Sequence, residues 1–347
     1  MLAISLVLPA AVGGAAEPPV APPGFFGVSE SVMTERDFEL LREADAGVYR
    51  TVFPFNGVRT KRNQPYDWSS FDRVVRETAE QGLELVPNPY GVPPWISKDR
   101  WTTPIGKKAL VREWDTFLRD LVARYGPTGE FWRLKENEYI PYRPVRIWQI
   151  WNEPNSITWW FPRPNPSEYA LLLQRSADAI QSVDPGAQIM TAGIVARPTN
   201  RHAIKGERYM KRLFKIRRAR EATDLLGYHP FAPSVSGVRK QIQSARKVLN
   251  RARIGSVPIW ITEIGWGSRG PAGHPLIKSE KGQVRALEDT FEMVIRERER
   301  LGIARLVWYH WRDYRDDLCR WCETSGLVNR KLGKKPLYYA FQRIANP

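Results

Sequence analysis

The sequence predicts a single-domain (β/α)8 barrel. Three observations support this fold class. Strand-like and helix-like segments alternate eight times along the chain, no shift in composition separates a second domain, and 42% of the 347 residues are hydrophobic, enough for one large core. Strict alternation implies a parallel sheet with right-handed crossovers. Eight such units in about 320 residues suit a closed barrel better than an open doubly wound sheet.

Eight short segments have the pattern of buried parallel strands. Each is a nearly continuous apolar run, rich in β-branched and aromatic residues. In chain order these predicted strands are residues 24–30, 48–54, 83–87, 145–153, 188–195, 225–231, 258–263 and 304–311.

After each strand comes a segment in which apolar residues recur every three or four positions, as on the inner face of an amphipathic helix. The first helix has Thr34 as a suitable N-cap with Asp37 three residues on, and Gly82 follows the second helix. In chain order the predicted helices are residues 34–46, 67–81, 106–125, 167–183, 208–220, 238–252, 281–301 and 335–344.

The first residues of the chain read as a targeting segment. Residues 1–16 are an apolar run closed by small residues, typical of a signal peptide cleaved near Ala16, although no basic residue precedes the run. The run is too short and too interrupted by Gly for a transmembrane helix. Residues 17–24 form a Pro-rich linker, and residues 25–347 form the barrel. We therefore expect a monomer that is secreted or associated with the cell wall, without stable membrane insertion.

Cysteine and histidine usage argues against a metal enzyme. The only cysteines are Cys319 and Cys322, and two thiols cannot form a four-ligand zinc site. Their place near the C-terminus does not suit a thioredoxin-like motif, so we predict a local disulfide. The four His residues lack the spacing of metal ligands. We expect neither a metal nor a cofactor.

The net charge of +16 is concentrated in residues 205–220 and 239–253. Both segments have the pattern of amphipathic helices, so a solvated outer helix face is one interpretation. The other is attraction to an anionic polysaccharide or cell-wall glycan. Nucleic acid is not an expected partner, because charge alone gives only nonspecific binding and no groove-reading motif accompanies it.

Two predicted strands end in a carboxylate among tryptophans. Glu153 ends the fourth strand and Glu263 ends the seventh. In a (β/α)8 barrel, catalytic groups project from these carboxyl ends, and strands three apart in a ring of eight face one another across the mouth. A structural salt bridge is the alternative for each residue. Paired carboxylates about 5–5.5 Å apart are what retaining glycoside hydrolysis requires, and a separation above about 8 Å would exclude it.

The runs Trp-Asn-Glu-Pro-Asn around Glu153 and Ile-Thr-Glu-Ile-Gly-Trp around Glu263 resemble the strand ends of the clan A retaining glycoside hydrolases. These include the family 5 cellulases and the family 39 xylosidase-like enzymes, and the resemblance covers essentially the whole chain after the linker. It implies that Glu153 is the acid/base and Glu263 the nucleophile. It also implies that Arg50 keeps Glu263 ionised and that Asn152 binds the sugar 2-hydroxyl.

Further residues are assigned by the same resemblance. Trp311 would be the platform beneath the cleaved sugar, with core packing as its alternative. His229 would lie in the barrel mouth, with a structural role as its alternative. The family often has a Tyr two residues after this His, where this chain has Phe231. Tyr228 or Tyr309 would then have to contact the nucleophile.

Aromatic residues are frequent, with 14 Trp, and a surplus of such rings often lines a sugar-binding groove. Trp95 and the pair Trp159 and Trp160 fall on long loops after the third and fourth strands, where they either line further subsites or anchor the loops. Asn88 and Tyr90 follow the third strand and are candidates for contacts with sugar hydroxyls.

Together these features predict a secreted retaining glycoside hydrolase that cuts β-linkages within a polysaccharide or glycoconjugate. A transglycosylase with the same site and a non-catalytic glycan-binding barrel are the alternatives. A barrel that only binds glycans would be expected to lack one of the carboxylates, and both are present.

Overall fold

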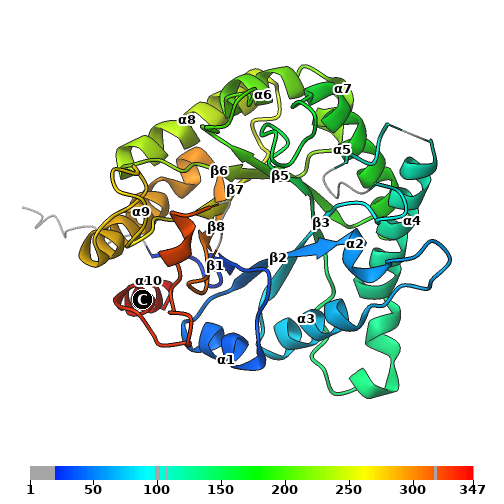
Figure 1. Cartoon of the computed structure of the whole chain (residues 1–347), viewed down its shortest axis with the longest axis horizontal. Coiled ribbons are helices and arrows are strands. Elements are labelled where there is room, and N and C mark those ends of the chain that lie inside the picture. The colour runs from blue at the N-terminus through cyan, green and yellow to red at the C-terminus, as the bar shows by residue number, and fades with distance from the viewer. Residues whose placement is uncertain (1–19, 98–101, 107, 316–318, 347) are drawn as a thin grey trace, which may run out of the picture.

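The computed structural model describes residues 20–97, 102–106, 108–315 and 319–346. The predicted signal peptide and residues 17–19 of the predicted linker lie outside this part of the chain. Eight parallel strands form a nearly closed barrel with helices around it (Figure 1), which confirms the predicted fold class. The strands are β1 (Phe26–Ser29), β2 (Val48–Pro54), β3 (Glu84–Tyr90), β4 (Ile147–Asn152), β5 (Gln188–Val195), β6 (Leu226–His229), β7 (Ile259–Ile264) and β8 (Ile303–Tyr309).

Helices lie on the outside of the barrel, where they cover the strands (Figure 1). The α-helices are α1 (Glu35–Glu43), α2 (Phe55–Val58), α3 (Ser69–Glu80), α4 (Lys108–Tyr125), α5 (Pro166–Gln181), α6 (Gly206–Leu213), α7 (Arg217–Glu221), α8 (Val235–Arg251), α9 (Glu280–Leu301) and α10 (Pro336–Ala345). Short 3-10 turns are η1 (Glu130–Arg133), η2 (Lys135–Asn137) and η3 (Cys322–Thr324). Among the described residues, no helix is long and apolar enough to span a bilayer.

The first helix begins where its capping residues predict. The Thr34 side chain accepts a hydrogen bond from the backbone N–H of Asp37, and the Thr34 N–H donates to the Asp37 carboxylate at 2.7 Å. This reciprocal pair satisfies donors that would otherwise be unpaired at the helix start.

The predicted helix over residues 208–220 is wrong in one respect, because the structure divides it into α6 and α7. Ile216 has an extended backbone, with φ −83° and ψ 121°, and interrupts the helical hydrogen bonding. The Arg220 guanidinium donates to the carbonyls of Phe214 and Lys215, at 2.7 and 3.1 Å. Those two carbonyls are left without helical partners by the break, and Arg220 satisfies them.

One joint of the barrel is held differently from the others. The ladders run in the order β3-β2-β1-β8-β7-β6-β5-β4, and no backbone ladder joins β3 to β4 within the described residues. Pro87 and Pro89 deprive β3 of two backbone donors. The Asn88 side-chain amide donates instead to the β4 carbonyls of Gln149 and Trp151, at 2.9 and 2.7 Å. We call this contact the Asn88 seam.

The inside of the barrel is filled by its own small apolar cluster, separate from the larger core between strands and helices. Its members point into the barrel, most of them from positions at or next to the start of a strand and Val307 from later in β8: Val48, Val86, Ile147, Met190, Leu225, Trp260 and Val307. Side chains alternate along a strand, so residues two positions further on also point inward, nearer the carboxyl ends. The cluster therefore forms the floor beneath the residues described next.

Candidate active site

The polar residues at the barrel mouth continue the inward-facing alternation. Arg50 follows Val48 on β2 by two positions, and Gln149 follows Ile147 on β4 in the same way. Both side chains are buried, and they meet across the barrel, where Arg50 Nε donates to Gln149 Oε1 at 2.5 Å. A regular strand geometry is therefore sufficient to place Arg50.

The end of β4 departs from regular strand geometry. Trp151 has φ +70° and Glu153 has φ +36°, both in the left-handed region that non-glycine residues rarely occupy. Trp151 packs outward, with its ring 5.9 Å from that of Trp114 on α4. Asn152 then faces inward, where its Oδ1 accepts a hydrogen bond from Arg50 Nη2 at 3.0 Å. Such local strain is characteristic of functional sites.

Glu263 is brought inward by an irregularity in β7. The Trp260 side chain belongs to the interior cluster, so strict alternation would place Thr262, and not Glu263, inward. The register with β8 shifts between Ile261 and Ile264, as in a β-bulge. Bulges redirect side chains and are frequent beside active sites. Glu263 consequently reaches Arg50, with 2.7 Å between Oε1 and Nη1.

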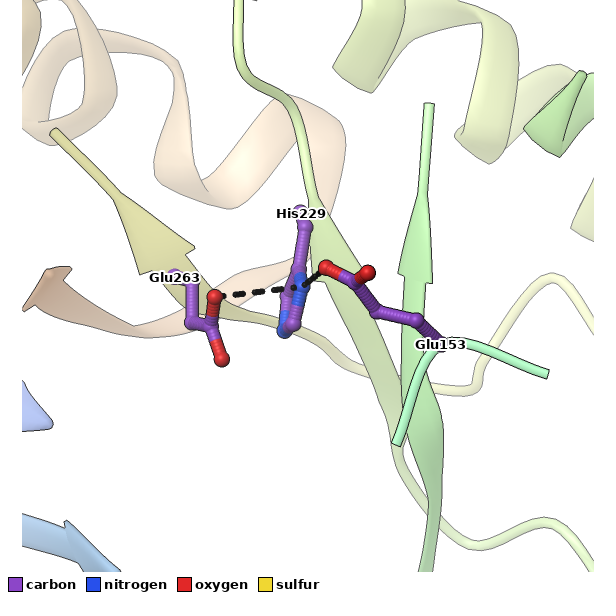
Figure 2. A group of neighbouring side chains, drawn as sticks. All are labelled: Glu153, His229 and Glu263. Carbon is purple, nitrogen blue, oxygen red and sulfur yellow. Dashed lines mark hydrogen bonds and ion pairs between the residues drawn. The ribbon is translucent and has the colours of Figure 1, made fainter. Parts of the chain in front are cut away.

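His229, at the end of β6, lies between the two carboxylates (Figure 2). Its Nδ1 is 2.9 Å from Glu153 Oε1 and 3.5 Å from Glu263 Oε2. One nitrogen or oxygen from each of these three side chains lies within 4.8 Å of the others. Carboxylates 110 residues apart in the chain therefore converge at one place, within the separation that a retaining mechanism requires.

Each nitrogen of the Arg50 guanidinium donates a hydrogen bond. Its side chain is 4% exposed, and besides Gln149, Asn152 and Glu263 it donates to Ser29 Oγ at 3.1 Å. A buried guanidinium is tolerated because every face of it is hydrogen bonded and its charge is matched by a carboxylate. The arrangement holds Glu263 in one orientation and compensates its negative charge.

Glu153 and His229, which lie next to each other in the site, both have shifted pKa values. Burial raises the pKa of Glu153 to about 7, and the positive charge of Arg50 opposes this shift. Burial lowers the pKa of His229 to about 4, against the attraction of the Glu263 charge. His229 is therefore neutral near pH 7, and its Nδ1–H can donate to an ionised Glu153. Glu153 can carry a proton under the same conditions, as a general acid must.

Gly193 on β5 leaves the space that the His229 ring occupies. A Cβ at this position would lie 1.9 Å from His229 Nε2, closer than any side chain tolerates. His229 Nε2 is buried without a hydrogen-bond partner among the described residues. The space beside Gly193 thus accommodates the His229 ring on one side, and contacts with the two carboxylates hold the ring on the other.

Three predicted substrate-binding residues are fully buried and bond to other parts of the fold, so the predicted contacts with sugar do not follow from their positions. Trp311 is fully buried, and its Nε1 donates to Asp37 of α1 at 2.8 Å. Trp160 is also fully buried and donates to Glu168 at 3.2 Å, so it anchors the loop after β4. Asn88 is buried in the seam. Whether such a ring or amide faces the mouth or the core depends on its neighbours in the folded protein. The sequence pattern does not specify those neighbours.

Other predicted residues remain near the mouth. Tyr309 is partly exposed, and burial, followed by the charge of Glu263, raises its pKa. Its hydroxyl is 3.3 Å from that of Tyr314. Tyr228 is instead turned toward α8, where its hydroxyl donates to the Gln241 carbonyl at 3.3 Å. Trp95 is half-buried, with the Arg59 guanidinium 5.4 Å from its ring centre.

Several residues of the site were missed from the sequence. Ser29 and Gln149 hold Arg50, and their inward position after the strand alternation was an available signal. Trp321 is half-buried, with its ring 5.2 Å from Phe231 and 6.5 Å from Tyr309, and so forms the outer part of an aromatic group. It lies in the loop closed by the disulfide between Cys319 and Cys322, which the structure contains.

The donor set of Glu153, His229 and Glu263 could hold a metal ion by its spacing alone. The Arg50 guanidinium, 2.7 Å from Glu263, already supplies a positive charge at this position. A metal would have to share Glu263 with this cation, which Coulomb repulsion disfavours.

Solved structures share this architecture. One is a family 39 glycoside hydrolase from Bacteroides cellulosilyticus WH2, with 16% identity, a TM-score of 0.68, and coverage of 93% of this chain and 63% of that one. The fold shared with it is a (β/α)8 barrel. Another is a monomeric beta-xylosidase from Caulobacter crescentus CB15, with 16% identity, a TM-score of 0.68, and coverage of 94% and 70%.

Xylanase 10B from Thermotoga maritima is similar over nearly its full length, with 14% identity, a TM-score of 0.61, and coverage of 93% of this chain and 95% of that one. At such identities the likeness establishes the fold, in agreement with the resemblance seen in the sequence. No family model and no curated protein matches the sequence.

Proposed function

We propose that the protein is a retaining glycoside hydrolase that cleaves β-glycosidic bonds by double displacement. The observation that carries this proposal is the convergence of Glu153 and Glu263 in two different electrostatic environments. One oxygen of each carboxylate and one nitrogen of His229 all lie within 4.8 Å of one another. One carboxyl has its pKa raised to about 7, and the other is paired with Arg50. An acid and a nucleophile need such a division.

The reaction follows from these positions. Glu263 attacks the anomeric carbon while the bond to the leaving oxygen breaks, and Glu153 gives its proton to that oxygen. In the second step, ionised Glu153 takes a proton from water, whose oxygen displaces Glu263 from the sugar. The neutral His229 donates to Glu153 between the two steps, and Asn152 lies beside Glu153 in position to bond the sugar 2-hydroxyl.

For the substrate we propose a β-linked polysaccharide or glycoconjugate cut at internal positions. Support comes from the half-buried aromatic residues on loops at the carboxyl ends of the strands: Trp95, Trp159 and Trp321. Flat aromatic rings suit the apolar faces of sugars, and several such rings suit a substrate of several sugars. The solved structures of similar fold include a xylosidase, a xylanase and a mannosidase, so xylans and mannans are the first substrates to test. We also propose that the protein is exported, on the basis of residues 1–16.

The deciding experiment traps the intermediate. Incubation with activated 2-deoxy-2-fluoro glycosides of xylose, glucose and mannose, followed by peptide mass mapping, is expected to place the label on Glu263. Glu263→Gln should acquire no label. A label on another residue would refute the nucleophile assignment, and release of product with inverted anomeric configuration would refute double displacement.

A second measurement tests the acid. Glu153→Ala should retain far more activity on aryl glycosides with good leaving groups than on natural glycans, because only the latter need protonation. Equal loss on both substrate classes would contradict this role. A transglycosylase would give the same labelling but would form longer products at high acceptor concentration, and a purely glycan-binding barrel would give no label.

A further inference from the structure

The positive charge of the protein is gathered on one side of the barrel. Residues 205–253 contain 14 Lys and Arg but only three Asp and Glu, a net charge of +11 out of +16 for the whole chain. This segment includes α6, α7 and α8. Helices α6 and α8 pack beside one another on the outside of the barrel, and α7 follows α6 (Figure 1).

Most of these basic side chains are exposed, and we call the exposed ones the basic face. Three of them are ion-paired: Lys211 with Glu207, Arg217 with Glu221 and Arg239 with Glu297. The others have no ion-pair partner among the residues that the structure describes. These are Lys205, Arg208, Arg212, Lys215, Arg218, Lys240, Lys247, Arg251 and Arg253.

The types of side chain that are exposed beside the cations limit the class of partner that the basic face can bind. The large apolar side chains that are exposed in the described part of the chain, such as Tyr139, Phe161 and Tyr339, all lie elsewhere. A face that enters a lipid bilayer needs apolar side chains to insert. A face that binds single-stranded nucleic acid usually offers rings on which bases stack. The basic face provides charge without either, which suits a hydrated polyanion.

The basic face also begins at the rim of the candidate active site. The N-terminus of α6 is joined to the end of β5, where the Gly206 N–H donates to the Ala196 carbonyl at 3.0 Å. Lys205 and Arg208 are exposed at this end of α6. A polymer that leaves the mouth on this side therefore meets a row of cations extending down the outer wall.

We infer that the basic face binds an acidic polysaccharide, one that carries carboxylate or sulfate groups, and holds it beside the mouth. This inference deepens the proposed function and rests on it for the choice of a glycan. Charges spread over a convex surface raise the local concentration of a polyanion without fixing one geometry. Binding should therefore be sensitive to salt and tolerant of sugar sequence.

The test uses polygalacturonate as the acidic probe and dextran as the neutral one. The variant Arg212→Gln, Lys215→Gln, Lys240→Gln, Lys247→Gln removes four unpaired charges from the basic face. The matched control Lys61→Gln, Arg62→Gln, Lys135→Gln, Lys331→Gln removes four exposed charges from other parts of the surface. We expect the first variant to bind polygalacturonate at least roughly 10-fold more weakly, and the control to bind like the wild type.

Two further probes identify the class of partner. Duplex DNA and phosphatidylserine vesicles are offered at the same ionic strength. Tighter binding to either than to polygalacturonate would overturn the inference, as would equal losses in the two variants or equal affinity for dextran. Binding requires no turnover, so Glu263→Gln should bind polygalacturonate as the wild type does even if the hydrolytic proposal fails. On a small neutral aryl glycoside, kcat and KM of the basic-face variant should be unchanged.

Discussion

At the scale of single residues, the site consists of a carboxyl that favours its neutral form and a carboxylate that is matched by a cation. Glu153, whose side chain is 17% exposed, lies beside a neutral His229, whereas Glu263 is held by Arg50. The same residue type therefore has two different environments, and in the proposed function these give it two chemical roles. Neither neighbour adjoins either Glu in sequence, so the difference arises only after folding.

The raised pKa of Glu153 has a consequence for stability. In the unfolded chain this carboxyl ionises near its ordinary pKa, and in the folded protein it ionises only near pH 7. Between these values the unfolded state has lost the proton that the folded state keeps, so the free energy of unfolding falls as pH rises toward 7. Glu153→Gln should become more stable than the wild type over this range, by up to about 3 kcal/mol at pH 8.

Urea unfolding of both proteins from pH 4.5 to pH 8 measures this difference. The exposed Glu138→Gln serves as the control and should show no such trend. A stability gain of Glu153→Gln that does not change with pH would contradict the proposed environment of Glu153.

The convergence of Glu153 and Glu263 could be predicted from the sequence because Glu is rare at the end of a buried strand, and because the surrounding runs resemble known motifs. The residues around the pair were less predictable. Trp311 was expected at the mouth but bonds to Asp37, whereas Trp321 was not expected there and lies beside Tyr309. The same sequence pattern allows a ring on a loop to face either the mouth or the core. Its burial depends on neighbours that are distant in the chain.

At the scale of elements, the site depends on departures from regular strands. Alternation alone places Arg50 and Gln149, but it would turn Glu263 away from the mouth. The bulge in β7, the left-handed Trp151 near the end of β4 and the left-handed Glu153 just after it reverse the expected directions. Strand existence and order could be read from apolar runs. No sequence pattern of comparable clarity predicts a bulge. The same holds for the break between α6 and α7.

Strand β5 contributes an empty space rather than a side chain. Gly193→Ala would put a Cβ against His229 Nε2, so the ring must move and lose its 2.9 Å contact with Glu153. We expect kcat to fall roughly 10-fold to 100-fold, which is less than the loss of a general acid–base group itself, because Glu153 is retained. Steady-state kinetics and the pH profile of the variant measure the effect.

Gly106→Ala is the matched control, because its Cβ would meet no atom within 4 Å. An altered apparent pKa in Gly193→Ala, with the folded state retained by circular dichroism, would assign the effect to His229 and not to general unfolding. A Gly193→Ala protein with wild-type kcat and pH profile would show that the position of the ring does not matter for catalysis.

At the scale of the whole molecule, the barrel is a ring of ladders with one joint closed by a side chain. Asn88→Leu removes both hydrogen bonds of the seam. Amides of β3 and β4 should then exchange with deuterium faster than in the wild type, while those of β1 and β8, which pair by a ladder, should be unaffected. Hydrogen exchange with mass spectrometry gives both values in one experiment.

Asn63→Leu, in an exposed turn, is the control for the added apolar side chain. Exchange that increases evenly around the barrel in Asn88→Leu would mean that the seam has no special part in holding β3 to β4. The sequence signalled this joint through Pro87 and Pro89, although their meaning for the barrel became evident only with the strand order.

The place of Arg50 gives it a second part in the structure. Glu263 on β7 lies three ladders from β2, which carries Arg50, and three ladders from β4, which precedes Glu153. Within the described residues, no ladder joins the two ends of this run, β3 and β4, and the hydrogen bonds of the seam connect them instead. The Arg50 guanidinium donates across the barrel to Gln149 and Asn152 of β4, and so it ties β2 to the far side of that joint. The cation that orients Glu263 is thus also a brace of the barrel wall, and its loss should loosen the same joint that Asn88 closes.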